Sequence, residues 1–155
     1  MPDLALITPD RPHNLGSALR LGACLGVPVH VVEPCGFPLD DRRIREAALD
    51  YGGAVSLVRH LDTARFLSWI AEEGRRLVLL TTRASSPFHA VRFADGDVLA
   101  VGSESDGAPP DIHDGADLRV RVPMVAGIRS LNLVTAATIV LTEALRQTGG
   151  FASLE

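Results

Sequence analysis

The sequence predicts an α/β fold, a mainly parallel sheet flanked by helices, in a single domain that spans residues 1–155. Short apolar runs alternate along the chain with longer amphipathic segments, a pattern typical of strands separated by helices. Glycine and proline lie mostly between these segments. With 46% hydrophobic residues in 155, the chain is long enough to fill one core. Strands that alternate with helices favour a parallel sheet covered on both faces.

The first strand is predicted at Leu4–Thr8, where the chain is apolar. A helix is predicted over Asn14–Leu25, with Asn14 as a suitable N-cap and a glycine directly after its last residue. The second strand follows at Val29–Val32.

The remaining elements continue the alternation. The last helix, Leu131–Leu145, is almost entirely apolar, and either Ser130 or Asn132 is suited to cap it. Further helices are predicted at Asp40–Leu49 and Thr63–Glu73, and extended segments at Val55–Val58, Leu77–Thr82, Val98–Gly102 and Leu118–Val122.

All 15 basic residues are arginine, although the net charge is −4. The overall charge argues weakly against nucleic acid, but binding of phosphate depends more on local cationic density. Arg42, Arg43 and Arg45 form one such cluster, and the planar guanidinium suits bidentate phosphate contacts. Asp40 and Asp41 precede the cluster, so pairing on a solvated helix is the alternative interpretation.

Several classes of protein are disfavoured. No apolar stretch approaches the roughly 18 to 20 residues that cross a bilayer, and no targeting segment opens the chain, so we expect a cytoplasmic protein without a membrane span. Cys24 and Cys35 lack the spacing of a metal site and are expected to be buried free thiols. The five histidines are scattered, and no metal is expected.

Three loops that follow predicted strands hold the candidate functional residues, because ligands of open α/β sheets bind beyond the carboxyl ends of the strands. Each loop alone has an ordinary structural explanation, as a helix cap or a tight turn. The loops span Pro9 to Arg20, Gly102 to Pro109 and Val122 to Asn132.

Taken together, the three loops resemble the motifs of the SPOUT superfamily of RNA 2′-O-methyltransferases. The first motif corresponds to Asn14, Gly16 and Arg20, the second to Gly102, Glu104 and Gly107, and the third to Pro123, Met124, Arg129, Ser130, Leu131 and Asn132. The resemblance extends over nearly the whole chain, which is similar to the minimal TrmL-type group. Further matches lie at Glu33–Pro34, Asp40–Arg43, Leu49–Tyr51, Leu80–Thr82 and Glu143–Gln147.

The resemblance implies a C-terminal trefoil knot, a homodimer and methylation of the wobble ribose, of cytidine or modified uridine, in leucine tRNAs. It also implies S-adenosylmethionine as the cofactor. The residues that it assigns to catalysis are Arg20, Asn14, Glu104, Ser130 and Asn132. Those assigned to the cofactor are Leu80, Thr81, Gly102, Val122, Met124, Ser130 and Leu131, and those assigned to RNA are Arg42, Arg43, Arg45 and Tyr51.

In the family, the counterpart of Arg20 activates the 2′-hydroxyl, sometimes as a general base. Neutralising an arginine with a pKa above about 12 near pH 7 costs about 7 kcal/mol. We therefore expect Arg20 to act as a cation that stabilises developing alkoxide charge and holds a phosphate. One residue departs from the family pattern: relatives commonly carry a basic residue at the position of Asp106. This departure leaves the exact tRNA target open.

Two other classes of function place different demands on the sequence. A dinucleotide-binding oxidoreductase needs a glycine fingerprint directly after the first strand, and the loop after Leu4–Thr8 lacks it. A non-catalytic RNA-binding module of the same fold, or an enzyme that methylates another RNA site, stays open.

Overall fold

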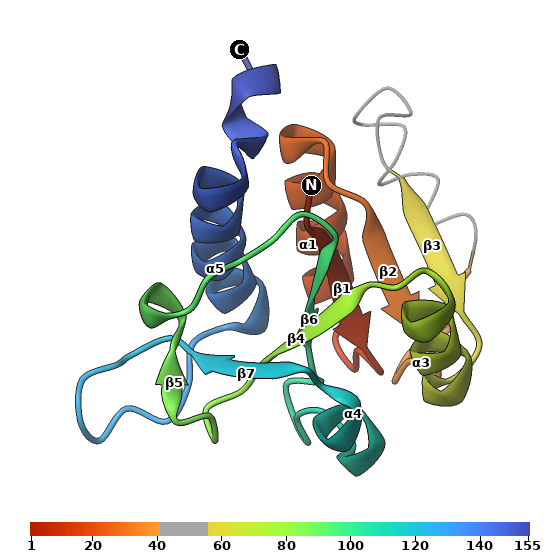
Figure 1. Cartoon of the computed structure of the whole chain (residues 1–155). Coiled ribbons are helices and arrows are strands. Elements are labelled where there is room, and N and C mark those ends of the chain that lie inside the picture. Colours follow the sequence, from red (N-terminus) through yellow and green to blue (C-terminus); the bar gives the residue numbers. More distant parts are fainter. Residues whose placement is uncertain (41–55) are drawn as a thin grey trace.

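The computed structural model describes residues 1–40 and 56–155, which build a seven-stranded sheet in the order β3-β2-β1-β6-β4-β7-β5 (Figure 1). Each neighbouring pair of strands is parallel. The strands are β1 Asp3–Ile7, β2 Val29–Val32, β3 Leu57–His60, β4 Arg76–Leu80, β5 Ser86–Pro87, β6 Asp97–Val101 and β7 Leu118–Arg121. The α-helices are α1 Pro12–Leu25, α3 Thr63–Glu72, α4 Pro110–Gly115 and α5 Leu133–Thr148, and 3-10 turns lie at Phe88–Ala90 and Gly150–Ser153.

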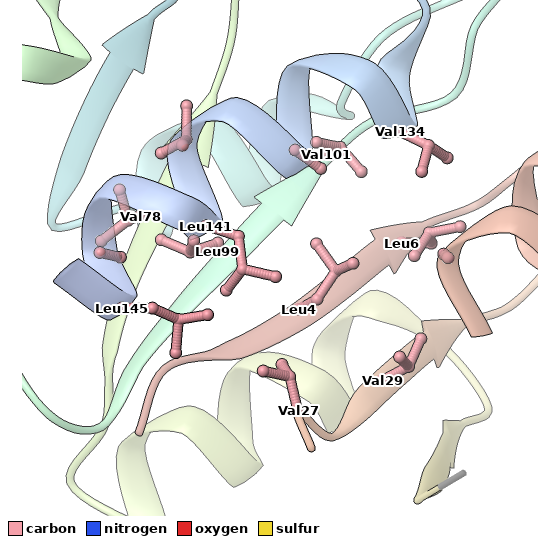
Figure 2. Close-up of a cluster of buried hydrophobic side chains, with 14 of the residues drawn as sticks. Leu4, Leu6, Val27, Val29, Val78, Leu99, Val101, Val134, Leu141 and Leu145 are labelled. Carbon is pink, nitrogen blue, oxygen red and sulfur yellow. The ribbon is translucent and has the colours of Figure 1, made fainter. Parts of the chain in front are cut away.

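Two layers of helices cover the sheet, with α1 and α5 packed together on one face and α3 and α4 on the other. Strand β1 contributes to the core on both faces of the sheet, because successive side chains of a strand point to opposite faces. Leu4 and Leu6 belong to the core beneath α1 and α5, whereas Ala5 and Ile7 belong to the core beneath α3 and α4. Figure 2 shows the first of these cores, in which Leu141 and Leu145 of α5 point toward the strands.

The structure confirms the predicted class, a parallel sheet flanked by helices. It adds two elements that the sequence did not predict, β5 and α4. Both are short and contain proline, so neither carries a periodic apolar pattern. Strand β3 extends to His60, two residues beyond the predicted end. The predicted helix at Asp40–Leu49 lies, apart from Asp40, outside the described residues. The trefoil knot and the single-domain organisation stay predictions.

The two cysteines differ from expectation. Both thiols are free, but Cys24 is exposed and Cys35 is half-buried, so the prediction that both are buried was wrong. Cys24 lies near the end of α1 on a face that points to solvent. Burial, together with the charge of nearby Glu33, raises the pKa of the Cys35 thiol to about 11, which keeps it protonated and unreactive.

A buried polar cluster lies between the sheet and α3. The His30 ring contacts His60 on one side, with 2.9 Å between Nδ1 and Nε2, and the Asp3 carboxylate on the other at 3.2 Å. Arg75 completes an ion pair with Asp3 at 2.7 Å, and its guanidinium lies over the Trp69 ring. Burial and the neighbouring His30 lower the pKa of His60 to about 4.

This cluster predicts a loss of stability in mild acid. Because the folded-state pKa of His60 is below its value of about 6.5 in the unfolded chain, the unfolded state takes up the proton first. The contribution of neutral His60 to the free energy of unfolding is therefore complete above pH 6.5 and declines as the pH falls toward 4. Urea denaturation is expected to show a loss of about 1 to 2 kcal/mol between pH 7 and pH 5. His60→Gln is expected to flatten this dependence, whereas a His89→Gln control at an exposed histidine retains it. An unchanged slope in the His60 variant would contradict the assignment.

Candidate active site

Three loops meet at the carboxyl end of the sheet and are joined by a chain of side-chain hydrogen bonds. Asn132 Nδ2 donates to Asn14 Oδ1 at 2.9 Å, and Asn14 Nδ2 donates to Glu104 Oε2 at 2.9 Å. These residues come from the loop before α5, from the first turn of α1 and from the loop after β6. The chain of bonds thus brings together one residue from each of the three predicted motifs.

The start of α5 determines which atom of the Asn132 amide donates to Asn14. Asn132 is the N-cap of the helix, and its Oδ1 accepts from the backbone N–H groups of Val134 at 2.9 Å and Thr135 at 3.2 Å. The oxygen must face these donors, so the amide nitrogen of Asn132 is left to donate to Asn14. Of the two candidate caps, the structure selects Asn132.

Asn14 is not the N-cap of α1. Helix α1 begins at Pro12 with Arg11 as the N-cap, so Asn14 lies inside the first turn and the capping prediction was wrong. Its side chain is only 1% exposed, and its amide bridges Asn132 and Glu104. A buried amide with both ends bonded rigidly fixes the carboxylate it holds.

The Glu104 loop turns tightly at its base. Ser103 and Gly107 exchange backbone hydrogen bonds of 3.0 Å in both directions, and Gly107 has a φ of +76°. A β-carbon on Gly102 would lie 2.1 Å from the Ala108 nitrogen and 2.1 Å from the Gly107 carbonyl carbon. Only glycine fits where the loop closes on the end of β6.

A pocket of about 310 Å³ opens beside this loop, and apolar side chains, among them Val122 and Leu131, supply much of its wall. All seven residues predicted to hold the cofactor line it: Leu80, Thr81, Gly102, Val122, Met124, Ser130 and Leu131. Glu104 also lines it. The pocket is additionally lined by Arg83, Arg121 and His113, which were not predicted as site residues because none of the three motifs contains them.

Asp106, the residue that departs from the resembled second motif, lies at the boundary between this pocket and a second hollow of about 700 Å³. The second hollow lies over the ends of β1 and β2 and shares Ser103 and Asp106–Ala108 with the first. The Asp106 backbone N–H donates to the Ser103 hydroxyl at 3.1 Å, so this residue also supports the turn.

The other predicted site residues lie elsewhere. Arg20 is exposed on α1 and lines neither pocket of the described chain. It follows Asn14 by six residues, about 9 Å along the helix axis and on a different face. Arg42, Arg43, Arg45 and Tyr51, predicted to bind RNA, lie outside the described residues. Within residues 1–40 and 56–155, no cluster of three histidine, cysteine or acidic side chains has the arrangement of a metal site. In the same part of the chain, no helix has the length and apolar character needed to cross a membrane.

Comparison with known proteins agrees with this geometry. Residues 2–142 match the SpoU rRNA Methylase family. The chain belongs to that family. A relative from Beijerinckia indica subsp. indica, named tRNA (cytidine(34)-2'-O)-methyltransferase, is 49% identical over 97% of this chain and 94% of its own length. A relative of the same name from Escherichia coli K12 is 42% identical over 96% of this chain and 95% of its own.

Solved structures share the fold. One, described as "Structural insights into the 2-OH methylation of C/U34 on tRNA", superposes with a TM-score of 0.85 at 35% identity and covers 95% of both chains. An AdoMet-bound rRNA methyltransferase from Sinorhizobium meliloti superposes with a TM-score of 0.82 at 26% identity, over 94% of this chain and 56% of its own. The match to a SPOUT-type methyltransferase is thereby confirmed.

Proposed function

We propose that this protein transfers the methyl group of S-adenosylmethionine to the 2′-hydroxyl of nucleotide 34, a cytidine or modified uridine, in tRNA. The observation that carries the proposal is the bonded chain Asn132–Asn14–Glu104 at the edge of an apolar pocket. Near full-length relatives that carry this activity in their names support the choice of substrate. Leucine tRNAs as the substrates and the cytoplasm as the location extend the same proposal.

The pocket fits the proposed cofactor. Its volume of about 310 Å³ lies at the lower end of the range of small-molecule sites, and a mostly apolar wall with a few fixed polar groups is typical of them. Leu80, Val122 and Leu131 would enclose the adenosine part, while Ser130 and Glu104 supply polar atoms at the open side. When bound, the cofactor supplies a methyl group already activated by a sulfonium.

The remaining task of the protein is to align the acceptor hydroxyl and manage its proton. Glu104, fixed through Asn14, is placed to accept a hydrogen bond from the ribose or from the cofactor's amino group. Asn132 holds this arrangement to the start of α5. Arg20 would stabilise the developing negative charge on the oxygen and contact the neighbouring phosphate, as a cation throughout.

Arg20 lines neither pocket of its own subunit. A homodimer would place Arg20 of one subunit beside the pocket of the other. Three apolar side chains around the pocket loop are exposed, Val125 at 79%, Ile128 at 60% and Leu131 at 38%, and exposed apolar groups so close together are typical of an interface. We therefore expect parts of both subunits at each active site. Sedimentation should give a dimer, and mixing Arg20→Ala with Asn14→Ala subunits should restore activity that neither variant has alone.

The direct test is incubation with labelled S-adenosylmethionine and total tRNA, followed by mapping of 2′-O-methylated nucleotides. Methylation confined to position 34 would support the proposal. Methylation at another position would favour an enzyme with a different RNA target. Tight tRNA binding with neither methyl transfer nor cofactor binding would leave the non-catalytic RNA-binding module as the better reading.

The role of Arg20 predicts a graded series. Arg20→Lys keeps the charge but loses the planar guanidinium, and we expect the single-turnover rate to fall about tenfold. In Arg20→Ala the same rate is expected to fall by about 10² to 10³-fold. Arg65→Ala, at an exposed arginine on the opposite helical layer, serves as the matched control. Full activity in the lysine variant would count against a geometric role for the guanidinium.

A further inference from the structure

The carboxylate of Asp10 holds the backbone of the Glu104 loop. Its Oδ1 accepts from the Glu104 N–H at 3.0 Å, and its Oδ2 accepts from the Ser105 N–H at 3.1 Å and from the Ser105 hydroxyl. Asn14, four residues further along the same segment, holds the Glu104 side chain. The loop after β1 therefore fixes Glu104 at two points, its backbone and its carboxylate.

Asp10 is itself fixed to the sheet. Thr8 donates its N–H to the Val32 carbonyl at 2.8 Å, and Gly36 donates to the Pro9 carbonyl at 2.9 Å. A β-carbon on Gly36 would lie only 2.9 Å from the Asp10 α-carbon, so the chain after β2 packs directly against this residue. The hydrogen bonds of Asp10 thus connect a rigid part of the sheet to an exposed turn.

The side chain of Asp10 is ionised at neutral pH. Partial burial raises its pKa, but the hydrogen bonds from the Ser105 hydroxyl and from the Glu104 and Ser105 backbones outweigh burial, and the pKa lies below the usual 3.8. Both oxygens are therefore acceptors under assay conditions. An asparagine at this position would turn one oxygen into an NH₂ group facing a backbone N–H donor.

We propose that Asp10 is a positioning residue of the methyl-transfer reaction, which sets the location of Glu104 by holding the backbone that carries it. The proposal rests on the proposed function, since it assigns Asp10 a role in that same site. Asp10 acts through Glu104 and need not touch the RNA or the cofactor. Displacements on the order of 1 Å in a catalytic group are enough to lower a rate by about 100-fold.

A double-mutant cycle between Asp10 and Glu104 tests this role. Single-turnover methylation of tRNA is measured for wild type, Asp10→Ala, Glu104→Ala and the double variant. If Asp10 acts through Glu104, Asp10→Ala lowers the rate by about 10-fold or more, and the double variant is no slower than Glu104→Ala. Cofactor affinity by calorimetry is expected to fall no further in Asp10→Ala than in Glu104→Ala, because Asp10 does not itself line this pocket.

Two further measurements keep the test decisive. Asp95→Ala removes an exposed carboxylate far from both pockets and controls for the loss of a surface charge. Amide hydrogen exchange in Asp10→Asn should show lost protection at Glu104 and Ser105, with protection in β1 and β6 unchanged. This readout does not depend on activity and covers the case in which the alanine variant fails to fold.

The outcomes separate the two proposals. Wild-type enzyme that neither binds S-adenosylmethionine nor methylates tRNA overturns the proposed function, and the positioning role with it. If the wild type is active, either of two results overturns the role of Asp10 alone. The first is multiplicative losses in the double variant, and the second is full activity with unchanged exchange in the Asp10 variants.

Discussion

Replacing Asn14 with alanine is expected to reduce the rate of methyl transfer by about 100-fold or more. The side chain is buried and bonded at both ends, so its removal leaves the Glu104 carboxylate and the Asn132 amide without the partner that orients them. Loss of one preorganised polar contact in an active site typically lowers a rate by about 10² to 10³. Since a buried cavity also forms, the melting temperature should fall by several degrees.

Asn14→Asp separates orientation from packing, because it keeps the shape of the side chain. The new carboxylate can still accept from Asn132, but it places a negative charge against Glu104 where an N–H donor stood. We expect a rate as low as that of the alanine variant, and a melting temperature below that of the wild type, because a second carboxylate is buried beside the first. Single-turnover kinetics and thermal melting give the two quantities. An aspartate variant with wild-type activity would show that the bond to Glu104 has no catalytic consequence.

The fold was predictable from sequence where periodicity was strong. Val29–Val32 and α1 through Leu25 end where apolar runs and a glycine place them. Strand β5 and helix α4 were not predictable, because two residues or six residues with adjacent prolines leave no period to detect. Strand order cannot be read locally either, since β6 lies between β1 and β4 only through pairing of segments far apart in the chain.

The candidate site was also predictable from sequence only in part. Motif residues located the pocket, and every residue predicted to hold the cofactor lines it. Only the capping interpretation of Asn14 was wrong, because an asparagine near a helix start looks like a cap, and α1 begins two residues earlier than its sequence indicates. Asp10 was missed although it lies in the loop after β1, three residues beyond the strand end, at the sheet edge where ligand sites gather. A carboxylate in that position was the available signal.

The Gly102→Ala substitution should have the largest effect on the pocket itself. The added β-carbon would meet backbone atoms 2.1 Å away, and backbone cannot rotate aside as a side chain can. The Ser103–Gly107 turn must therefore move away from β6, and Glu104 moves with it. Overpacking of this kind destabilises by about 1 to 3 kcal/mol, which for a chain of this length lowers the melting temperature by roughly 3 to 12 °C.

Cofactor binding should also suffer in the Gly102 variant, because the displaced turn forms one wall of the pocket. We expect S-adenosylmethionine affinity to fall by at least about 100-fold in calorimetry. Gly16→Ala is the matched control for folding: a β-carbon there meets nothing within 4 Å, and alanine favours the helix by about 0.5 to 1 kcal/mol. If the Gly102 variant melted and bound cofactor like wild type, the turn would be free to move, and rigid placement of Glu104 could not be part of catalysis.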